Sequence, residues 1–368
     1  MIFTIAILKE VKVMNNTDKK PAGFLMDRLT NTFSFFKSMT PKSEKDGMNN
    51  DVKVLHPFSV ILNKEISDHV RSWRFVLLVL IIALTCFASL FTALSNIGKA
   101  VKPGDPEGAF FFLKLFTLTD GTLPPFMVFI SFLGPLLGIS LGFDAVNSEQ
   151  NNRTLSRILA QPIYRDYVLN AKFLAALIVI SVMFFALVFL VMGIGLIAIG
   201  IPPTVEEFFR ILCFIILSIL YVAFWLNLSV LFSVRFRQPA TSALSGIAVW
   251  LFFTIFYGMI VNLAIKPYTP SAMSTDRYIY VFESFRLGLL RVMPNQLFTE
   301  ATTTLLMPAV RSLGPLTMEQ VYGTIPGPLP LSQSLLMVWP QVTGLIAATV
   351  LCFALSYVSF MRREIRSR

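Results

Sequence analysis

The chain has 368 residues, of which 55% are hydrophobic and only 14% are charged, and it contains 35 phenylalanines. This composition excludes an ordinary soluble domain and predicts an all-α polytopic membrane protein. The formal net charge of +10 does not indicate nucleic acid as a partner, because the basic residues gather beside the ends of apolar runs, where they act as topology signals.

The first region, residues 1–54, is rich in Asn, Lys, Asp and Ser, which predicts a flexible cytoplasmic tail. From Pro57 onward, apolar residues recur every three or four positions, with charged residues such as Glu65 and Arg71 between them. This spacing predicts an amphipathic helix. Because the pattern runs directly into the first long apolar stretch, we expect this helix to lie in the cytoplasmic interface of the membrane; an ordinary soluble helix is the alternative.

Six stretches are long enough to span a membrane, since a helix needs about 20 mostly apolar residues to cross the hydrocarbon core. The predicted spans cover residues 75–96, 123–143, 173–200, 211–234, 240–265 and 335–361. An even number of spans places both termini on the same side. The excess of Lys and Arg beside the span ends falls on that side, which predicts that both termini are cytoplasmic.

The second span carries Gly134, Gly138 and Gly142, a double G-x-x-x-G spacing that places three glycines on one helix face. Such a face lets the backbone of another helix approach closely. Pro135 predicts a kink in the same helix. A packing seam between helices and a hinge in a substrate pathway both fit this pattern.

A polar segment separates the second span from the third. It predicts a short helix over residues 149–160, with Asn147 or Ser148 as N-cap and Pro162 at its end. The apolar face of this helix consists of Leu155, Ile158 and Leu159, while Arg153 and Arg157 point elsewhere. A short helix of this kind suits docking into a cleft of a cytoplasmic partner and receiving force from it; an ordinary positively charged loop is the alternative.

The connection between the fifth and sixth spans, residues 266–334, is too long for a simple link. We expect part of this extracytoplasmic loop to be structured. Residues 278–291 predict an amphipathic helix with Glu283, Arg286 and Arg291 among apolar positions. A gate over the transport pathway and a cap on the outer surface are both consistent with this helix.

The run F-D-A-V-N-S-E-Q-N-N-R-T-L-S-R-I-L-A-Q-P-I-Y-R-D-Y-V-L-N-A-K resembles the signature of ABC-2-type transporter permeases. The matching positions are Glu149, Thr154, Leu155, Leu159, Pro162, Arg165 and Lys172, and Arg153 stands where the family commonly has Gly. N-K-E-I-S-D-H-V-R-S-W-R-F, with Glu65 and Arg71, is similar to the family's amphipathic segment before the first span. M-P-N-Q-L-F-T-E-A-T-T-T-L-L-M-P resembles its segment before the last one.

This resemblance implies that residues 55–368 form the transmembrane domain of an ATP-binding-cassette exporter in the plasma membrane of a prokaryote. The domain would pair with a second permease, identical or related, and with cytoplasmic ATPase subunits. Residues 149–160 would be the coupling helix, and Arg235 and Arg237 a second cytoplasmic contact. The residues implied to couple to the ATPase are Glu149, Thr154, Leu155, Arg157, Leu159, Pro162 and Arg165.

The chain lacks a G-x-x-x-x-G-K-[ST] loop, so we expect ATP and Mg²⁺ to bind only to the partner subunit and this chain to carry no cofactor and no catalytic residue. Two other classes of membrane protein fit the sequence less well. A self-sufficient secondary transporter or channel normally needs polar groups at mid-membrane, where Asn227 is the most polar residue. An intramembrane enzyme would need a nucleophile with a base, but both histidines precede the first span.

Overall fold

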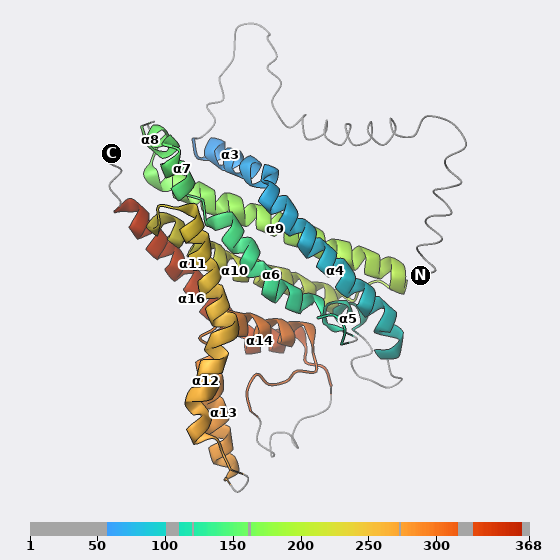
Figure 1. Ribbon diagram of the computed structural model, residues 1–368. Helices are drawn as coiled ribbons and strands as arrows, with labels where there is room; N and C mark the ends of the chain where they lie inside the picture. Colours follow the sequence, from blue (N-terminus) through green and yellow to red (C-terminus); the bar gives the residue numbers. More distant parts are fainter. Residues whose placement is uncertain are drawn as a thin grey trace, which may run out of the picture. The chain divides into compact units, whose positions relative to one another are not determined.

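The computed structural model describes residues 57–100, 110–119, 121–160, 163–271, 274–315 and 327–362 (Figure 1). The predicted cytoplasmic tail, residues 1–54, lies outside these ranges. The described residues form helices and contain no strand. The first helices are α3 (Pro57–Arg71), α4 (Trp73–Ala100), α5 (Phe111–Thr117), α6 (Phe126–Gly142), α7 (Asn147–Asn151), α8 (Thr154–Leu159), α9 (Arg165–Ile199) and α10 (Val205–Arg235). The others are α11 (Pro239–Leu251), the π-helix η3 (Phe252–Phe256), α12 (Tyr257–Ile265), the 3-10 helix η4 (Lys266–Tyr268), α13 (Asp276–Leu290), α14 (Pro294–Leu306) and α16 (Leu331–Met361).

Six helical stretches in the described part of the chain are long and apolar enough to cross a membrane. They are Trp73–Asn96, Phe126–Asn151, Arg165–Ile199, Val205–Arg235, Pro239–Tyr268 and Leu331–Met361. This finding confirms the predicted all-α, six-span fold class. The third stretch begins at Arg165, before the predicted start at residue 173, because the preceding polar segment continues the same helix and buries Val168 and Leu169.

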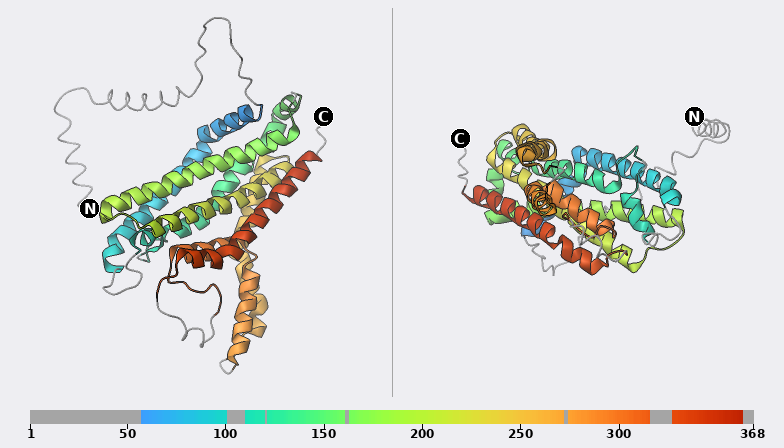
Figure 2. Two further views of the ribbon diagram at one scale, coloured as in Figure 1. Left: turned by 180° about the vertical axis from the view of Figure 1, so that it is seen from behind. Right: turned by 90° about the horizontal axis from the view of Figure 1, so that it is seen from below.

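Helix α10 forms the centre of the bundle. It packs against α6, α9, α11, α14 and α16, and it carries the buried side chains of Phe214, Tyr221 and Trp225. In the most apolar 18-residue stretch of α10, 67% of the residues are buried. The corresponding share is 22% in the α4 span and 17% in the α11–α12 span. Figure 2 shows α9, α10 and α16 running alongside one another. The outer helices therefore expose apolar side chains, as expected of surfaces that face lipid.

The glycines of the second span lie against α10. A Cβ atom on Gly134 would meet Val222 Cγ2 at 3.0 Å, and one on Gly138 would meet Val222 O at 2.7 Å. At Gly142 the added atom would lie 2.8 Å from Leu226 O. Backbone atoms cannot move aside as a flexible side chain can, so α6 and α10 approach this closely only because these positions lack side chains.

Pro135 lies inside α6 without ending the helix. Proline has no amide hydrogen, so it leaves the carbonyl of the residue four positions earlier without its helical partner. That carbonyl belongs to Ser131, and the hydroxyl of Tyr221 on α10 donates to it at 3.0 Å. The ring of Tyr221 also stacks on Phe298 of α14 at 4.3 Å. The proline is thus accommodated by a contact from the central helix.

The loop before the last span is structured. The helix predicted over residues 278–291 corresponds to α13, where Arg286 pairs with Glu283 at 3.1 Å and donates to Asn262 Oδ1 of α12 at 3.2 Å. Helix α14 follows and packs against α10 and α16. Its buried Glu300 accepts hydrogen bonds from Arg291 at 2.9 Å and from Gln341 of α16 at 3.0 Å.

Arg210 ties the beginning of α10 to two neighbouring helices. Its side chain is fully buried and pairs with Glu206 at 2.9 Å. The guanidinium also donates to the carbonyl of Leu305 in α14 at 3.0 Å and to Ser334 Oγ in α16 at 3.3 Å. This end of α10 is therefore fixed to the end of α14 and to the start of α16.

Candidate functional site

The polar segment between the second and third spans forms two short helices, α7 and α8, instead of the single helix predicted over residues 149–160. The break lies at Asn152 and Arg153, where Arg153 has a φ of 57°. This left-handed conformation is unfavourable for residues with a Cβ atom and favours glycine. By the resemblance described above, this is also the position at which ABC-2-type permeases commonly have Gly.

The beginning of α7 is held by a side chain from α10. Val146 occupies the N-cap position and provides no side-chain cap, so neither Asn147 nor Ser148 caps the helix as predicted. The amides of Val146 and Asn147 both donate to Ser233 Oγ, at 2.9 and 3.2 Å. At the other end of α7, Asn151 Nδ2 donates to the carbonyl of Arg237 at 3.0 Å. Both ends of α7 are thus fastened to the end of α10 and the turn that follows it.

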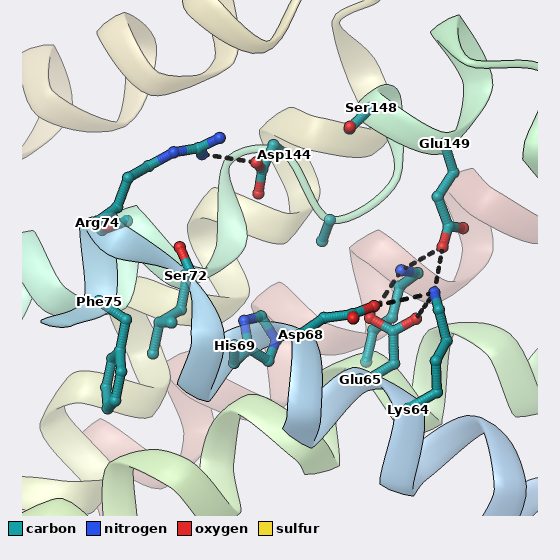
Figure 3. A pocket seen from close by; sticks show the side chains of 14 residues that line it. Lys64, Glu65, Asp68, His69, Ser72, Arg74, Phe75, Asp144, Ser148 and Glu149 are labelled. Atoms are coloured by element: carbon teal, nitrogen blue, oxygen red, sulfur yellow. Dashed lines mark hydrogen bonds and ion pairs between the residues drawn. The ribbon is translucent and has the colours of Figure 1, made fainter.

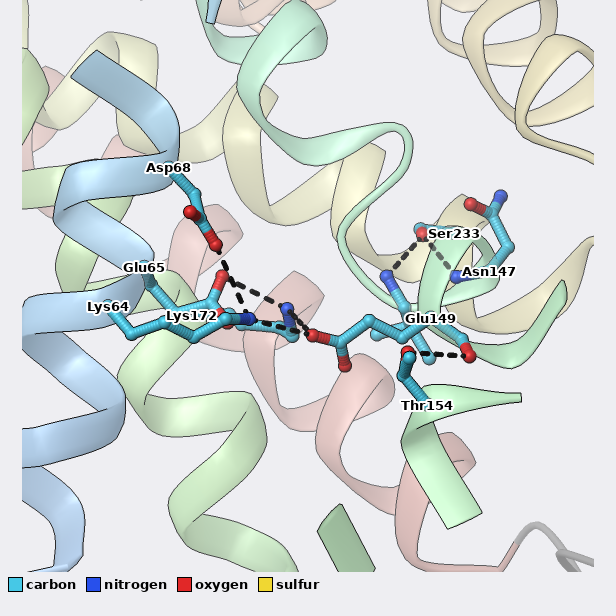
Figure 4. A network of polar contacts seen from close by, with 9 residues as sticks. Lys64, Glu65, Asp68, Asn147, Glu149, Thr154, Lys172 and Ser233 are labelled. Carbon is cyan, nitrogen blue, oxygen red and sulfur yellow. Dashed lines mark hydrogen bonds and ion pairs between the residues drawn. The ribbon is translucent and has the colours of Figure 1, made fainter. Parts of the chain in front are cut away.

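A charge cluster joins α7 to α3 and α9 (Figure 4). Lys172 Nζ of α9 lies 3.0 Å from Glu65 Oε2 of α3 and 2.9 Å from Glu149 Oε1 of α7. Lys64 Nζ lies 2.9 Å from Glu65 Oε1 and 3.4 Å from Glu149 Oε1. The side chains of Lys172 and Glu65 are only 6% and 8% exposed, whereas that of Lys64 is 51% exposed. One buried ammonium therefore connects three helices.

Helix α3 packs on α9 and turns one charged side chain, that of Glu65, inward. Glu65 is its buried residue, whereas Val70 is 51% exposed and Arg71 is exposed. Burial alone raises the pKa of Glu65, but the charges of Lys172 and Lys64 outweigh this effect and hold the pKa below its ordinary value. Glu65 is therefore ionised at neutral pH. The predicted helix exists, but it presents a carboxylate to the bundle and leaves Val60 and Val70 exposed.

A cleft of about 220 Å³ opens beside this cluster, between α3, the start of α4 and residues 140–149 (Figure 3). Across it, Arg74 Nη1 lies 2.7 Å from Asp144 Oδ2. The side chain of Arg74 is 58% exposed, so this ion pair contributes little stability. His69 also lines the cleft, and burial lowers its pKa, which favours the neutral imidazole.

The predicted coupling residues have different environments. Leu155 is only 4% exposed and belongs to the apolar core, so its side chain does not lie on the surface of this chain. Its role in coupling stays a prediction. Thr154 donates from its hydroxyl to the carbonyl of Glu149 at 3.2 Å and links α8 to α7. Arg157 and Arg165 are exposed. Pro162 and the side chains of Ile158 and Leu159 lie outside what the structure describes.

The exposed surface of this region is basic and polar. Arg153 and Arg157 contribute from the α7–α8 segment, and Arg235 and Arg237 from the turn between α10 and α11. The hydrogen bond from Asn151 to the Arg237 carbonyl joins the two stretches. The two predicted cytoplasmic contacts are thus joined by this hydrogen bond.

The sequence prediction named Lys172 only as a position of the family signature, without its partners, and did not single out Lys64 or Ser233. For Lys172 the sequence contained a signal of burial. Val168 lies four positions before it and Ala175 three positions after it, so all three residues share one helix face, and that face is buried. For Ser233 no local signal exists, since its partners lie 86 and 87 residues away in the chain.

Asn227 has the environment of a packing residue. It is fully buried, and its amide donates to the carbonyl of Thr349 in α16 at 3.5 Å, while Ser356 of α16 donates to the Asn227 carbonyl at 3.4 Å. No group of three or more His, Cys, Asp or Glu side chains in the described ranges is arranged to hold a metal ion. The polar contacts of Asn227 therefore hold α10 against α16.

A comparison with protein families matches residues 59–365 to the family described as ABC-2 family transporter protein. A comparison with curated proteins finds no significant match. The matched region includes all six candidate spans, the charge cluster and the α7–α8 segment. The chain is therefore a multi-pass membrane permease that belongs to the ABC-2 family of transporter proteins.

Proposed function

We propose that this chain is the membrane-spanning half of an ABC exporter driven by a separate cytoplasmic ATPase subunit. Two permeases, identical or related, pair in the plasma membrane of a prokaryote, with both termini of each chain in the cytoplasm. ATP and Mg²⁺ bind to the ATPase, and this chain carries out no chemistry. Closure of the ATPase subunits on ATP displaces the α7–α8 segment, and the resulting movement of the spans opens a path for substrate between the permeases toward the outside.

The observation that carries this proposal is the way the α7–α8 segment is held. A five-residue helix has little stability of its own. Here α7 is fixed to α3 and α9 through Lys172 and to α10 through Ser233. A surface segment attached at several points to the long helices can pass an applied displacement to them, whereas a loose positively charged loop cannot.

The face offered to the ATPase is basic. Leu155 packs inward and Glu149 pairs with Lys172, so the exposed charged side chains among the described residues of this segment are Arg153 and Arg157. We infer that the ATPase presents acidic side chains to this face. Such contacts steer association and fix the register of two partners.

The test is affinity purification of the tagged chain from its native membranes in mild detergent, followed by mass spectrometry and an ATPase assay. We expect recovery of a protein with a G-x-x-x-x-G-K-[ST] loop. The double substitution Arg153→Glu and Arg157→Glu should reduce its recovery at least about tenfold, since like charges across an interface cost several kcal/mol.

The matched control is Arg277→Glu, which reverses an exposed charge on α13, in the loop predicted to be extracytoplasmic. This variant should recover the ATPase as the parent chain does. Recovery of the parent chain without any ATPase, and without nucleotide-dependent activity, would contradict the proposal and favour a self-sufficient transporter or channel.

A further inference from the structure

Ser233 lies at the contact between the α7–α8 segment and the central helix. It is fully buried, near the end of α10, and its hydroxyl oxygen accepts from the amides of both Val146 and Asn147. The first amides of a helix lack partners within the helix and are usually capped by a neighbouring residue of the same segment. In α7 the cap comes from a different helix. Movement of α7 away from α10 would leave two buried amides without acceptors, which is costly.

A second hydrogen bond prevents α7 from pivoting about Ser233. The helix is about 7.5 Å long, and its far end is tied through Asn151 Nδ2 to the Arg237 carbonyl. The attachment points on α10 and its following turn are only four residues apart. A displacement of α7 therefore has to move the end of α10 or break both attachments.

Helix α10 extends from this end to the opposite end of the bundle. Ser233 and Arg210 are separated by 23 residues, or about 35 Å along the helix axis. Arg210 there holds the Leu305 carbonyl of α14 and Ser334 of α16. The glycine seam with α6 and the packing with α16 support α10 along its length. The helix therefore links the α7–α8 segment to the far ends of α14 and α16.

From this geometry we propose that Ser233 is a positioning residue that delivers the displacement of α7 to α10, and through Arg210 to α14 and α16. The inference rests on the proposed function and deepens it by assigning a route through the centre of the bundle. Lys172 connects α7 only to α3 and α9. Hydrogen bonds of the Ser233 and Asn151 side chains connect α7 to α10 and its following turn.

The route is tested on the complete complex of permease and ATPase by hydrogen–deuterium exchange, with and without ATP and orthovanadate, so that no substrate is needed. In the parent complex, nucleotide should change exchange both at residues 147–159 and at the far end, residues 204–212 and 329–336. In Ser233→Ala, the change at residues 147–159 should persist, while the change at the far end should fall about fivefold or more.

Two variants separate the role of the hydroxyl from ordinary packing. Ser233→Thr keeps the hydroxyl and should retain the far-end response. Ser229→Ala removes an equally buried hydroxyl one turn earlier, which donates to the carbonyl of Ile139 in α6 at 3.1 Å, and it should also retain the response. Loss of the response in Ser229→Ala to the same degree would overturn the assignment to Ser233.

An undiminished far-end response in an assembled Ser233→Ala complex would overturn the inference while leaving the proposed function intact. If the Ser233→Ala complex does not assemble, the route is tested with Asn151→Ala. The control is Asn152→Ala, which changes the exposed neighbouring residue. Only Asn151→Ala should weaken the far-end response; equal responses in the two variants would overturn the route. If the proposed function itself is wrong, the unmodified chain will not co-purify with any ATPase.

Discussion

Replacement of Lys172 by methionine should destabilise the protein, because it leaves two buried carboxylates facing each other. The side chains of Glu65 and Glu149 are 8% and 13% exposed. Removal of one partner of a buried ion pair costs about 3–5 kcal/mol. Lys64 stays within 2.9 Å of Glu65 and 3.4 Å of Glu149, but a half-exposed lysine compensates only in part. We therefore expect a loss near the lower limit, about 3 kcal/mol.

The measurement is thermal unfolding of the purified chain in detergent, followed by reaction of a thiol-specific dye with cysteines that the fold buries. Cys86 and Cys352 are 2% and 8% exposed, so both report unfolding. For a chain of 368 residues, a loss of about 3 kcal/mol corresponds to a decrease in Tm of roughly 4 °C. Arg165→Met, which removes an exposed basic side chain from the same helix, should change Tm by less than about 1 °C.

A double-mutant cycle tests the cause of the effect. Glu149→Gln removes one of the two carboxylates. The stability lost in the double variant Glu149→Gln, Lys172→Met should therefore be clearly smaller than the sum of the losses in the two single variants. A strictly additive cycle, or a Tm of Lys172→Met equal to that of the parent, would refute the argument that Lys172 neutralises these carboxylates.

Three further predictions concern the same Tm assay. Gly138→Ala should lower Tm by several degrees, because its Cβ would lie 2.7 Å from Val222 O, whereas Gly193→Ala, with nothing within 4 Å, should leave Tm unchanged or slightly raised; equal effects would contradict the close approach of α6 and α10. Arg153→Val should be about 1–2 kcal/mol less stable than Arg153→Gly, because φ at this position is 57°; a valine variant as stable as the glycine variant would be inconsistent with the break between α7 and α8. The pKa of Glu65 is lowered in the folded state, so its stabilisation is complete above the ordinary value of 4.5 and is lost as the pH falls through the lower folded-state pKa. Acidification should thus reduce the Tm of the parent more steeply than that of Glu65→Gln, and parallel pH profiles would count against this linkage.

The number and the approximate extent of the spans could be predicted because they depend on local composition. Within a membrane, each apolar stretch must pair its backbone N–H and C=O groups in a helix, whichever other helices lie beside it. The boundaries of the spans depend on packing. Helix α9 begins at Arg165 because Val168 and Leu169, near its start, are buried. The break of the fifth span into α11, η3 and α12 had no recognisable signal in the sequence.

The candidate site could be located from the sequence, but its contacts could not. The pattern around Leu155 indicates a small apolar face and does not reveal whether the Leu155 side chain points outward or into the core, where the structure places it. The sequence pattern predicts that Glu65 is a solvent-facing charge on an amphipathic helix. It is buried instead, because Lys172, 107 residues away in the chain, pairs with it. Contacts of this kind follow from the tertiary arrangement of α3, α7 and α9.

Site-specific cross-linking from α8 tests most directly whether this segment receives the ATPase. A photoreactive amino acid is placed at Arg157 and, as a control, at Arg277, and the captured proteins are identified from intact native membranes. We expect that position 157 captures a protein with a G-x-x-x-x-G-K-[ST] loop and that position 277 does not. Capture of such a protein only at position 277, or at neither position while it co-purifies with the chain, would contradict the account.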